Sequence, residues 1–183
     1  MTRPLRKDAA LRRAALLRSA AELFEKEGID TPLDRIAEHA GVGRATLYRN
    51  FSGRTDIALA VLTVEFESLG ERFSTDQNPD VFLHFLTALS VAMDRNSALR
   101  GVVQAASSPD ILTPMRAALA RAATGPLRVS QAAGVVRADV KPGDLRVLAT
   151  MLAGPLATAS PAERAAIRRR TLMFVLEAVR TRA

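Results

Sequence analysis

The spacing of apolar residues predicts helices throughout this chain and shows no strand pattern. The segment 33–51 is the most informative. Its first half places apolar side chains on one helix face, at the i, i+3, i+4 and i+7 spacing: Leu33, Ile36, Ala37 and Ala40. Gly41 can adopt the left-handed conformation that ends a helix, and a second helical run, 44–49, begins three residues later. The pattern predicts two short helices joined by a tight turn.

The residues before the first of these helices mark its start. Thr31 can cap the helix, Pro32 suits its first position, and Asp34 completes the spacing of a capping box. Val42 is apolar although it lies in the turn, so we expect it to pack into the core between the two helices.

Helical periodicity continues on both sides of this pair. We expect further helices at 8–27, 54–73, 80–95, 98–106, 115–123, 127–133, 143–158 and 161–181. The dipeptide Gly125-Pro126 separates two of them, because proline interrupts a helix. Residues 1–7 are expected to form a disordered basic arm, either a plain flexible terminus or a contact to nucleic acid. The sequence thus predicts an all-α fold with an N-terminal domain, 1–53, and a C-terminal domain, 54–183, which share the helix 54–73.

Two short helices around a tight, glycine-containing turn match a helix-turn-helix, although ordinary helical hairpins have the same outline. In a DNA-binding helix-turn-helix, the second helix enters the major groove and reads bases from its N-terminal residues. Residues 44–49 suit that role, because a guanidinium, a methyl, a hydroxyl and a phenol surround the anchor Leu47. Arginine can bind guanine through two hydrogen bonds, and alanine and threonine can contact the thymine methyl group.

Residues 6–58 resemble the DNA-binding domain of the tetracycline-repressor (TetR) family of bacterial transcription regulators. The resemblance is carried by Ala20, Phe24, Gly28, Leu33, Ile36, Ala37, Ala40, Gly41, Val42, Thr46, Leu47, Tyr48, Phe51 and Arg54. The chain departs from the family pattern at Gly43, where serine is usual, and at Asn50, where histidine is frequent. From their chemistry and from the resemblance, the residues expected to contact DNA are Thr31, Arg44, Ala45, Thr46, Tyr48, Arg49, Asn50 and Arg54.

The two helices expected at 143–158 and 161–181 carry more apolar surface than one core-facing stripe needs. Either both lie centrally in the monomer, or a two-fold partner covers the remaining face. The TetR family dimerises through its last two helices, so the resemblance implies the second arrangement. The residues expected at the dimer interface are Leu145, Leu148, Leu152, Leu156, Ile167, Phe174, Val175 and Ala178.

The middle helices are expected to enclose an apolar pocket for a small-molecule effector. The expected lining is Phe66, Phe82, Phe85, Met93, Gln104, Met115 and Met151, with His84, Ser107 and Ser108 as further polar groups. Phenylalanine and methionine at helical spacing are also typical of plain core, and an isolated histidine is also typical of the surface. Each of these residues is therefore either a ligand contact or an ordinary core or surface residue.

Composition narrows the function classes. The net charge of +7 favours a polyanionic partner, and the first twenty residues hold six basic side chains against one acidic side chain. Cysteine is absent, which excludes disulfides, thiolate metal sites and a cysteine nucleophile. Two distant histidines, with no glycine-rich phosphate loop and no paired carboxylates, argue against an enzyme. We expect no metal or cofactor, no membrane segment and a cytoplasmic location.

These observations together favour a homodimeric DNA-binding transcriptional regulator. Its partners would be double-stranded DNA with a near-palindromic operator, a second copy of the chain, and a small apolar or amphipathic effector whose binding releases a repressor from DNA. The alternative is a helical protein-interaction module whose helix-turn-helix no longer binds DNA. The sequence leaves open the ligand, the operator and the sign of regulation.

Overall fold

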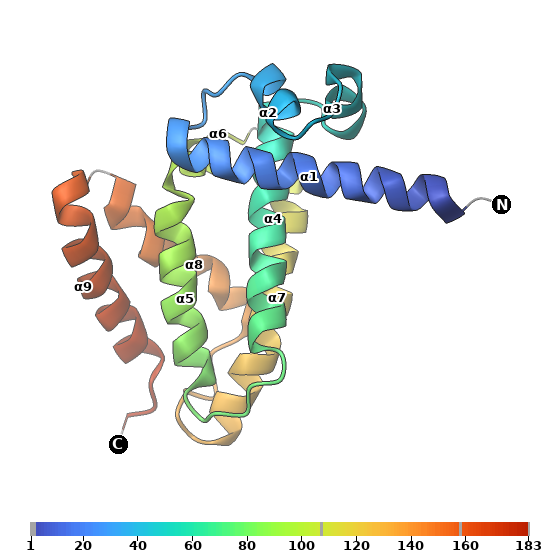
Figure 1. The fold of residues 1–183 in the computed structure, drawn as a ribbon. Helices are drawn as coiled ribbons and strands as arrows, with labels where there is room; N and C mark the ends of the chain where they lie inside the picture. Colours follow the sequence, from blue (N-terminus) through green and yellow to red (C-terminus); the bar gives the residue numbers. More distant parts are fainter. Residues whose placement is uncertain (1–2, 107, 158, 183) are drawn as a thin grey trace. The chain divides into compact units, whose positions relative to one another are not determined.

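The computed structural model describes residues 3–106, 108–157 and 159–182, and within these ranges the chain forms helices and no strand (Figure 1). The α-helices are α1 (Arg3–Glu27), α2 (Leu33–His39), α3 (Arg44–Asn50), α4 (Arg54–Phe73), α5 (Val81–Arg95), α6 (Arg100–Ala105), α7 (Thr113–Ala132), α8 (Leu145–Ala153) and α9 (Pro161–Val179). Short 3₁₀ turns lie at Ser97–Leu99, Pro109–Leu112, Pro142–Asp144 and Gly154–Ala157. The predicted all-α fold is confirmed.

Several predicted helix bounds are wrong. Helix α1 begins at Arg3, so the segment expected as a disordered arm is helical from that residue onward. The helix expected at 143–158 is shorter, because 3₁₀ turns flank α8 on both sides. The last residue of that expected helix, Thr158, lies outside the described residues.

Helix α7 corrects the prediction of two separate helices around Gly125-Pro126. It runs without interruption from Thr113 to Ala132, with Pro126 inside it. Its buried stripe continues through the proline, since Ala122, Pro126 and Leu127 are all buried. A proline inside a helix removes one hydrogen bond, and the apolar packing on both sides of Pro126 holds the helix together despite that loss.

The chain divides into two compact units, each described by itself. Unit 1 comprises Met1–Leu62 and Ala98–Leu112, and unit 2 comprises Thr63–Ser97 and Thr113–Ala183. Helix α4 contributes residues to both. The functional boundary at residue 53 remains a prediction, because compactness alone does not define a functional domain.

In unit 1, helices α1, α2 and α3 pack against one another. The expected inner stripe of α1 is buried, with Leu16, Ala20 and Phe24 each at most 1% exposed. Ile36 of α2 and Leu47 of α3 are buried to the same degree. The core of unit 1 therefore fixes the short helices α2 and α3, which are too short to be stable alone.

In unit 2, α5 is the central helix and packs against α7, α8 and α9. The rings of Phe82 and Phe85 stack with centroids 6.2 Å apart, and both side chains are fully buried. The backbone N–H of Phe82 donates to Ser130 Oγ of α7 at 3.0 Å. This bond satisfies one of the free amides that every helix start leaves, in a place that water does not reach.

The segment between α7 and α8 is held to the end of α9. Arg137 N–H donates to Val179 O at 3.0 Å, and Thr181 N–H donates to Val135 O at 3.0 Å. The side-chain amide of Gln131 donates to two carbonyls of the same segment, Arg137 O and Val140 O. Within the described ranges, no helix combines the length and the apolar character that a membrane span requires.

A capping box fixes the start of α9. The Glu163 carboxylate accepts hydrogen bonds from the backbone N–H of Ser160 at 3.1 Å and from its hydroxyl at 2.5 Å. These bonds favour the ionised form and lower the pKa of Glu163. The stabilisation is therefore present at neutral pH and is lost as the pH falls through that lowered pKa.

Gly70 of α4 should not tolerate a side chain. A Cβ at this position would lie 3.0 Å from the Cα of Ala122 in α7, which is closer than packed atoms normally approach. Alanine in a helix interior normally gains about 1 kcal/mol over glycine, but overpacking costs about 1–3 kcal/mol. We expect Gly70→Ala to lower the free energy of unfolding, measured by urea denaturation. Gly101→Ala, where the added Cβ meets open space, should not lower it. Equal effects of the two changes would contradict the close approach of α4 and α7.

Candidate nucleic-acid interface

The turn between α2 and α3 has the geometry that the sequence predicts. Gly41 adopts a φ of +66°, in the left-handed region, and its N–H donates to Glu38 O. Val42 is half-buried, and its N–H donates to Ala37 O at 3.0 Å. Gly43 stands at the N-cap of α3 in an extended conformation. Helix α3 is thus held at a fixed angle to α2 by the turn and by the buried Leu47.

The outer side of α3 is chemically suited to nucleic acid. Arg44, Ala45, Tyr48 and Arg49 are exposed, whereas Thr46 and Asn50 are half-buried. The exposed fraction of Tyr48 is 56%, which is high for a large aromatic side chain. Two guanidinium groups, a phenol and a methyl group therefore lie on one short helix without covering one another.

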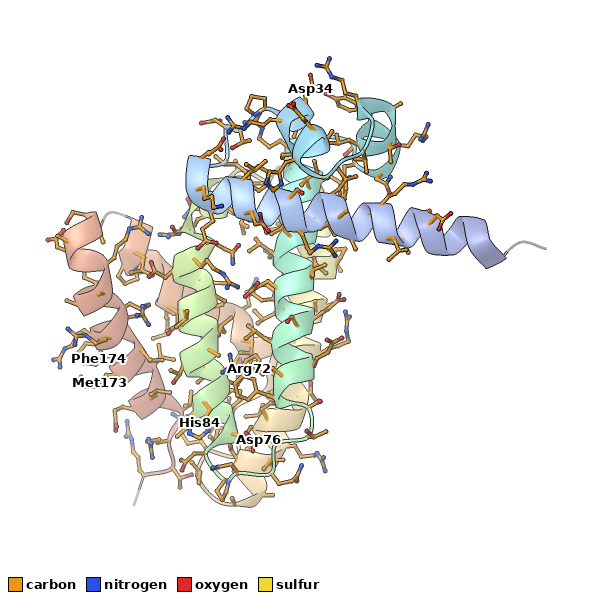
Figure 2. The ribbon with its side chains drawn as sticks, in the orientation of Figure 1. Asp34, Arg72, Asp76, His84, Met173 and Phe174 are labelled. Carbon is orange, nitrogen blue, oxygen red and sulfur yellow. The ribbon has the colours of Figure 1, made fainter. Side chains whose placement is uncertain are left out.

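Arg44 is paired with a carboxylate of α2. Its Nη2 lies 3.1 Å from Asp34 Oδ2, and the two side chains are 73% and 42% exposed; Figure 2 marks Asp34 on α2. On the same helix, Arg49 Nη2 donates to Thr46 Oγ1 at 3.0 Å. The sequence predicts only a capping role for Asp34, because this cross-helix pair depends on the angle between α2 and α3, which periodicity does not supply.

Helix α1 supports the end of α3 through one arginine. Arg13 Nη1 donates to Asn50 O at 3.1 Å, and its guanidinium lies 4.3 Å from the centroid of the Phe51 ring. The Asn50 side-chain amide donates back to Thr46 O at 2.8 Å, so it is not free for a phosphate in this state. The basic side chain of Arg13 therefore acts within unit 1 as a support for α3.

Two predicted contact residues are engaged in the loop before α2. Thr31 is buried, and its hydroxyl donates to Gly28 O at 2.8 Å instead of capping α2. Arg54, at the start of α4, donates to Ile29 O at 2.8 Å and lies 3.2 Å from the Asp30 carboxylate. In this state both side chains organise the loop, and a DNA contact by Arg54 requires that it leave Asp30.

Among the described residues that were predicted to line a ligand pocket, burial differs widely. Phe66, Phe82, Phe85 and Met115 are buried core residues, Met93 is half-buried, and Met151 is 42% exposed. Gln104, which belongs to unit 1, is exposed, and Ser107 lies outside the described residues. His84 is exposed and lines a groove formed by α4 and α5 in unit 2. The pocket lining therefore remains a prediction.

The residues predicted for a dimer interface fall into two groups. Five are in the core of unit 2 and at most 7% exposed, so they lack surface for a second chain: Leu145, Leu148, Leu152, Leu156 and Val175. Ile167 is half-buried, and Phe174 and Ala178 are exposed. The exposed apolar residues of α8 and α9 that the prediction did not include are Val147, Met151 and Met173. Helix α8 carries two apolar stripes in the sequence. The residues predicted for the dimer interface belong to the stripe that the structure places in the core of unit 2.

Asp34→Asn should raise the affinity of the chain for random DNA about 1.4- to fivefold, because an exposed ion pair is worth roughly 0.2–1 kcal/mol and must break before Arg44 can approach DNA. The dependence of binding on salt should also steepen, since one more cation is free to displace counterions. Fluorescence anisotropy at several salt concentrations measures both effects.

Glu27→Gln is the matched control for this change. It removes the same charge from an arginine pair in the same unit, Arg35–Glu27 at 2.8 Å, which does not involve α3. An equal gain in affinity for the two variants would mean that only net charge matters and that the Asp34–Arg44 pair has no special role.

Comparisons with known proteins agree with this geometry. Residues 16–61 match the model of the family described as bacterial regulatory proteins, tetR family. An HTH-type transcriptional regulator of Staphylococcus aureus strain bovine RF122, SAB2452, is 33% identical over 70 residues, which is 38% of each chain. The corresponding regulator SAUSA300_2515 of strain USA300 is 37% identical over 59 residues, 32% of each chain. The aligned part thus spans only about a third of the length of these relatives, which are named as transcriptional regulators.

Solved structures extend the likeness to the whole fold. The chain is similar to a TetR transcription regulatory protein from Mycobacterium vanbaalenii, with a TM-score of 0.63 and 24% identity over 97% of this chain and 100% of that one. It is also similar to the TetR transcriptional regulator SCO0520 from Streptomyces coelicolor, with a TM-score of 0.60 and 27% identity over 93% of this chain and 99% of that one. Residues 16–61 thus match the model of the tetR family of bacterial regulatory proteins, and the fold of nearly the whole chain is similar to that of solved TetR regulators.

Proposed function

We propose that the chain binds double-stranded DNA as a homodimer and represses transcription until a small amphipathic ligand releases it. The observation that carries the proposal is the outer side of α3, where Arg44, Tyr48 and Arg49 are exposed on a helix held by a glycine turn. These groups are suited to the major groove and its flanking phosphates. The net charge of +7 favours the same partner. A DNA partner in a bacterium would place the protein in the cytoplasm.

The dimer is supported by exposed apolar side chains on the last two helices. Val147 and Met151 of α8 are 52% and 42% exposed, and Met173 and Phe174 of α9 are 41% and 53% exposed. Figure 2 marks the last two on α9. The guanidinium of Arg170 lies 4.5 Å from the Phe174 ring centroid, so a positive charge lies next to this exposed ring. A two-fold contact through this surface would bury it and present two copies of α3 to half-sites about 34 Å apart.

The parts of the proposal that concern repression and ligand release are carried by the resemblance to the TetR family. A ligand acts by favouring a state of the dimer in which the two α3 helices no longer match the half-site spacing. The free energy available for release is limited by the difference in the ligand's affinity for the two states.

Titration against the DNA upstream of the chain's own gene tests the DNA-binding function. Fluorescence anisotropy at several salt concentrations should give affinity at least ~10³-fold above that for random DNA of equal length. Equal and steeply salt-dependent affinity for both DNAs would reduce the interaction to non-specific charge attraction. Absence of binding to either DNA would favour a protein-interaction module that has lost DNA binding.

Sedimentation velocity tests the dimer. Phe174→Asp places a charge in the proposed contact and should shift the dimer towards monomer. Val64→Asp introduces the same charge at an exposed apolar residue of α4, 47% exposed, and should leave the dimer intact. Dissociation by both variants, or by neither, would argue against a contact centred on Phe174.

A further inference from the structure

A solvent-open groove follows the seam between α4 and α5 in unit 2. Its floor is apolar and comes from both helices, with Leu69 and Phe73 on α4 and Ala88, Val91 and Ala92 on α5. The cavity volume is about 510 Å³, which lies within the range of about 300–1,000 Å³ that small-molecule sites occupy. None of the residues predicted from the sequence to contact a ligand lines it, apart from His84.

The two ends of the groove differ in charge. At one end Arg95 of α5 forms an ion pair with Glu65 of α4, so this end is neutral overall. At the other end stand Arg72 of α4 and His84 of α5, and Figure 2 shows both toward the same end of the two helices. The edge-to-face contact of Phe73 with Phe85, with centroids 5.9 Å apart, brings the two helices together there.

Arg72 supplies an unneutralised positive charge. Its guanidinium lies 5.1 Å from the Phe73 ring centroid, and in the described part of the chain no carboxylate is within ion-pairing distance of it. Asp76, marked near this end in Figure 2, does not line the groove, and its carboxylate accepts the N–H of Asn78 at 2.8 Å. The groove therefore combines an apolar trough with a cationic end.

We propose that this groove binds an amphipathic anion, with a carboxylate at Arg72 and His84 and an aliphatic chain along Leu69 and Val91. An arginine that gains a carboxylate partner gains charge-assisted hydrogen bonds. The aliphatic chain is stabilised because its apolar surface is removed from water. The Glu65–Arg95 pair closes the far end and offers no free cation there, which sets the direction of the bound molecule. The role of the groove as an effector site rests on the proposed function. Its ability to bind an amphipathic anion does not depend on that function.

Isothermal titration calorimetry of the intact chain with decanoate, in the absence of DNA, tests the site directly. Decanoate should bind, and decyltrimethylammonium, with the same chain and the opposite charge, should bind at least tenfold more weakly. Arg72→Gln should weaken decanoate binding about tenfold or more, since a hydrogen bond to a charged group is lost. Ala88→Phe should abolish binding by filling the trough. Arg128→Gln removes an exposed arginine of α7 that does not line the groove, and should leave the affinity unchanged.

Three results would overturn the proposal: no binding of decanoate to the unaltered chain, equal affinity for the two amphiphiles, or equal decanoate affinity in the Arg72, Ala88 and Arg128 variants. Circular dichroism confirms that each variant is folded. Addition of decanoate to the DNA complex tests separately whether the groove binds the anion and whether that binding releases DNA. Binding of decanoate without release of DNA would support the groove as a binding site and contradict its role as an effector site. Absence of any DNA complex would contradict the proposed function and leave the calorimetric result standing.

Discussion

Arg44→Ala should weaken operator binding roughly 30-fold to 10⁴-fold, the largest functional effect that we expect from one substitution. A bidentate arginine–base contact is worth about 1–3 kcal/mol, and a homodimer would lose two of them. Arg44 stands at the start of α3 with 73% of its side chain exposed, so its removal leaves the fold of unit 1 intact. Fluorescence anisotropy with operator and random DNA measures the change.

Arg35→Ala is the matched control. Arg35 is an exposed arginine of α2 that, like Arg44, pairs with a carboxylate, and its removal changes the net charge by the same amount. The Arg44 variant should lose affinity for operator much more than for random DNA, whereas the Arg35 variant should lose little and lose it evenly. An even loss in the Arg44 variant would show that Arg44 contacts phosphates and does not read bases.

Leu86→Ala should lower the free energy of unfolding by about 2–5 kcal/mol, through lost burial and the cavity that remains. Leu86 lies on α5, the central helix of unit 2, and its side chain is 0% exposed. The total stability of a domain is only about 5–15 kcal/mol, so this one change removes a large part of it. Urea denaturation followed by circular dichroism measures the loss.

Leu11→Ala makes the same chemical change on α1, where the leucine is 59% exposed. Its effect should stay within about 0.5 kcal/mol, as for most surface substitutions. A loss of similar size in both variants would mean that α5 is not the centre of the unit 2 core. A separate unfolding transition in the Leu86 variant alone would assign that transition to unit 2.

The helix-turn-helix could be predicted from the sequence because its determinants are local. The apolar spacing of α2, the left-handed Gly41 and the anchor Leu47 all act within a few residues of one another. The inner stripe of α1 was predictable for the same reason, since one helix face sets it. The chemistry of the exposed side of α3 follows directly once Leu47 is known to point inward.

The features that the sequence did not predict depend on contacts between separate segments. The local sequence around Pro126 predicts the end of a helix. Its burial in the core of unit 2 keeps α7 continuous. Helix α8 carries two apolar stripes, and only the packing of α5 and α9 determines that Leu148 points inward while Val147 remains exposed. The pairing of Arg44 with Asp34 likewise needs the angle between two helices. Periodicity predicts which residues share a face but not what that face meets.

The uninterrupted α7 has a weak point at one known position. Because Pro126 has no amide hydrogen, it cannot donate to the carbonyl oxygen of Ala122, four residues earlier. Ala122 is also the residue that Gly70 of α4 approaches most closely. At this level α7 thus lacks one backbone hydrogen bond, while the backbone of Gly70 packs closely against it. A bend of α7 at this turn therefore breaks one backbone hydrogen bond fewer than a bend elsewhere along the helix. If α7 bends, we expect it to bend at this turn, with the parts of the helix before and after it moving as rigid segments.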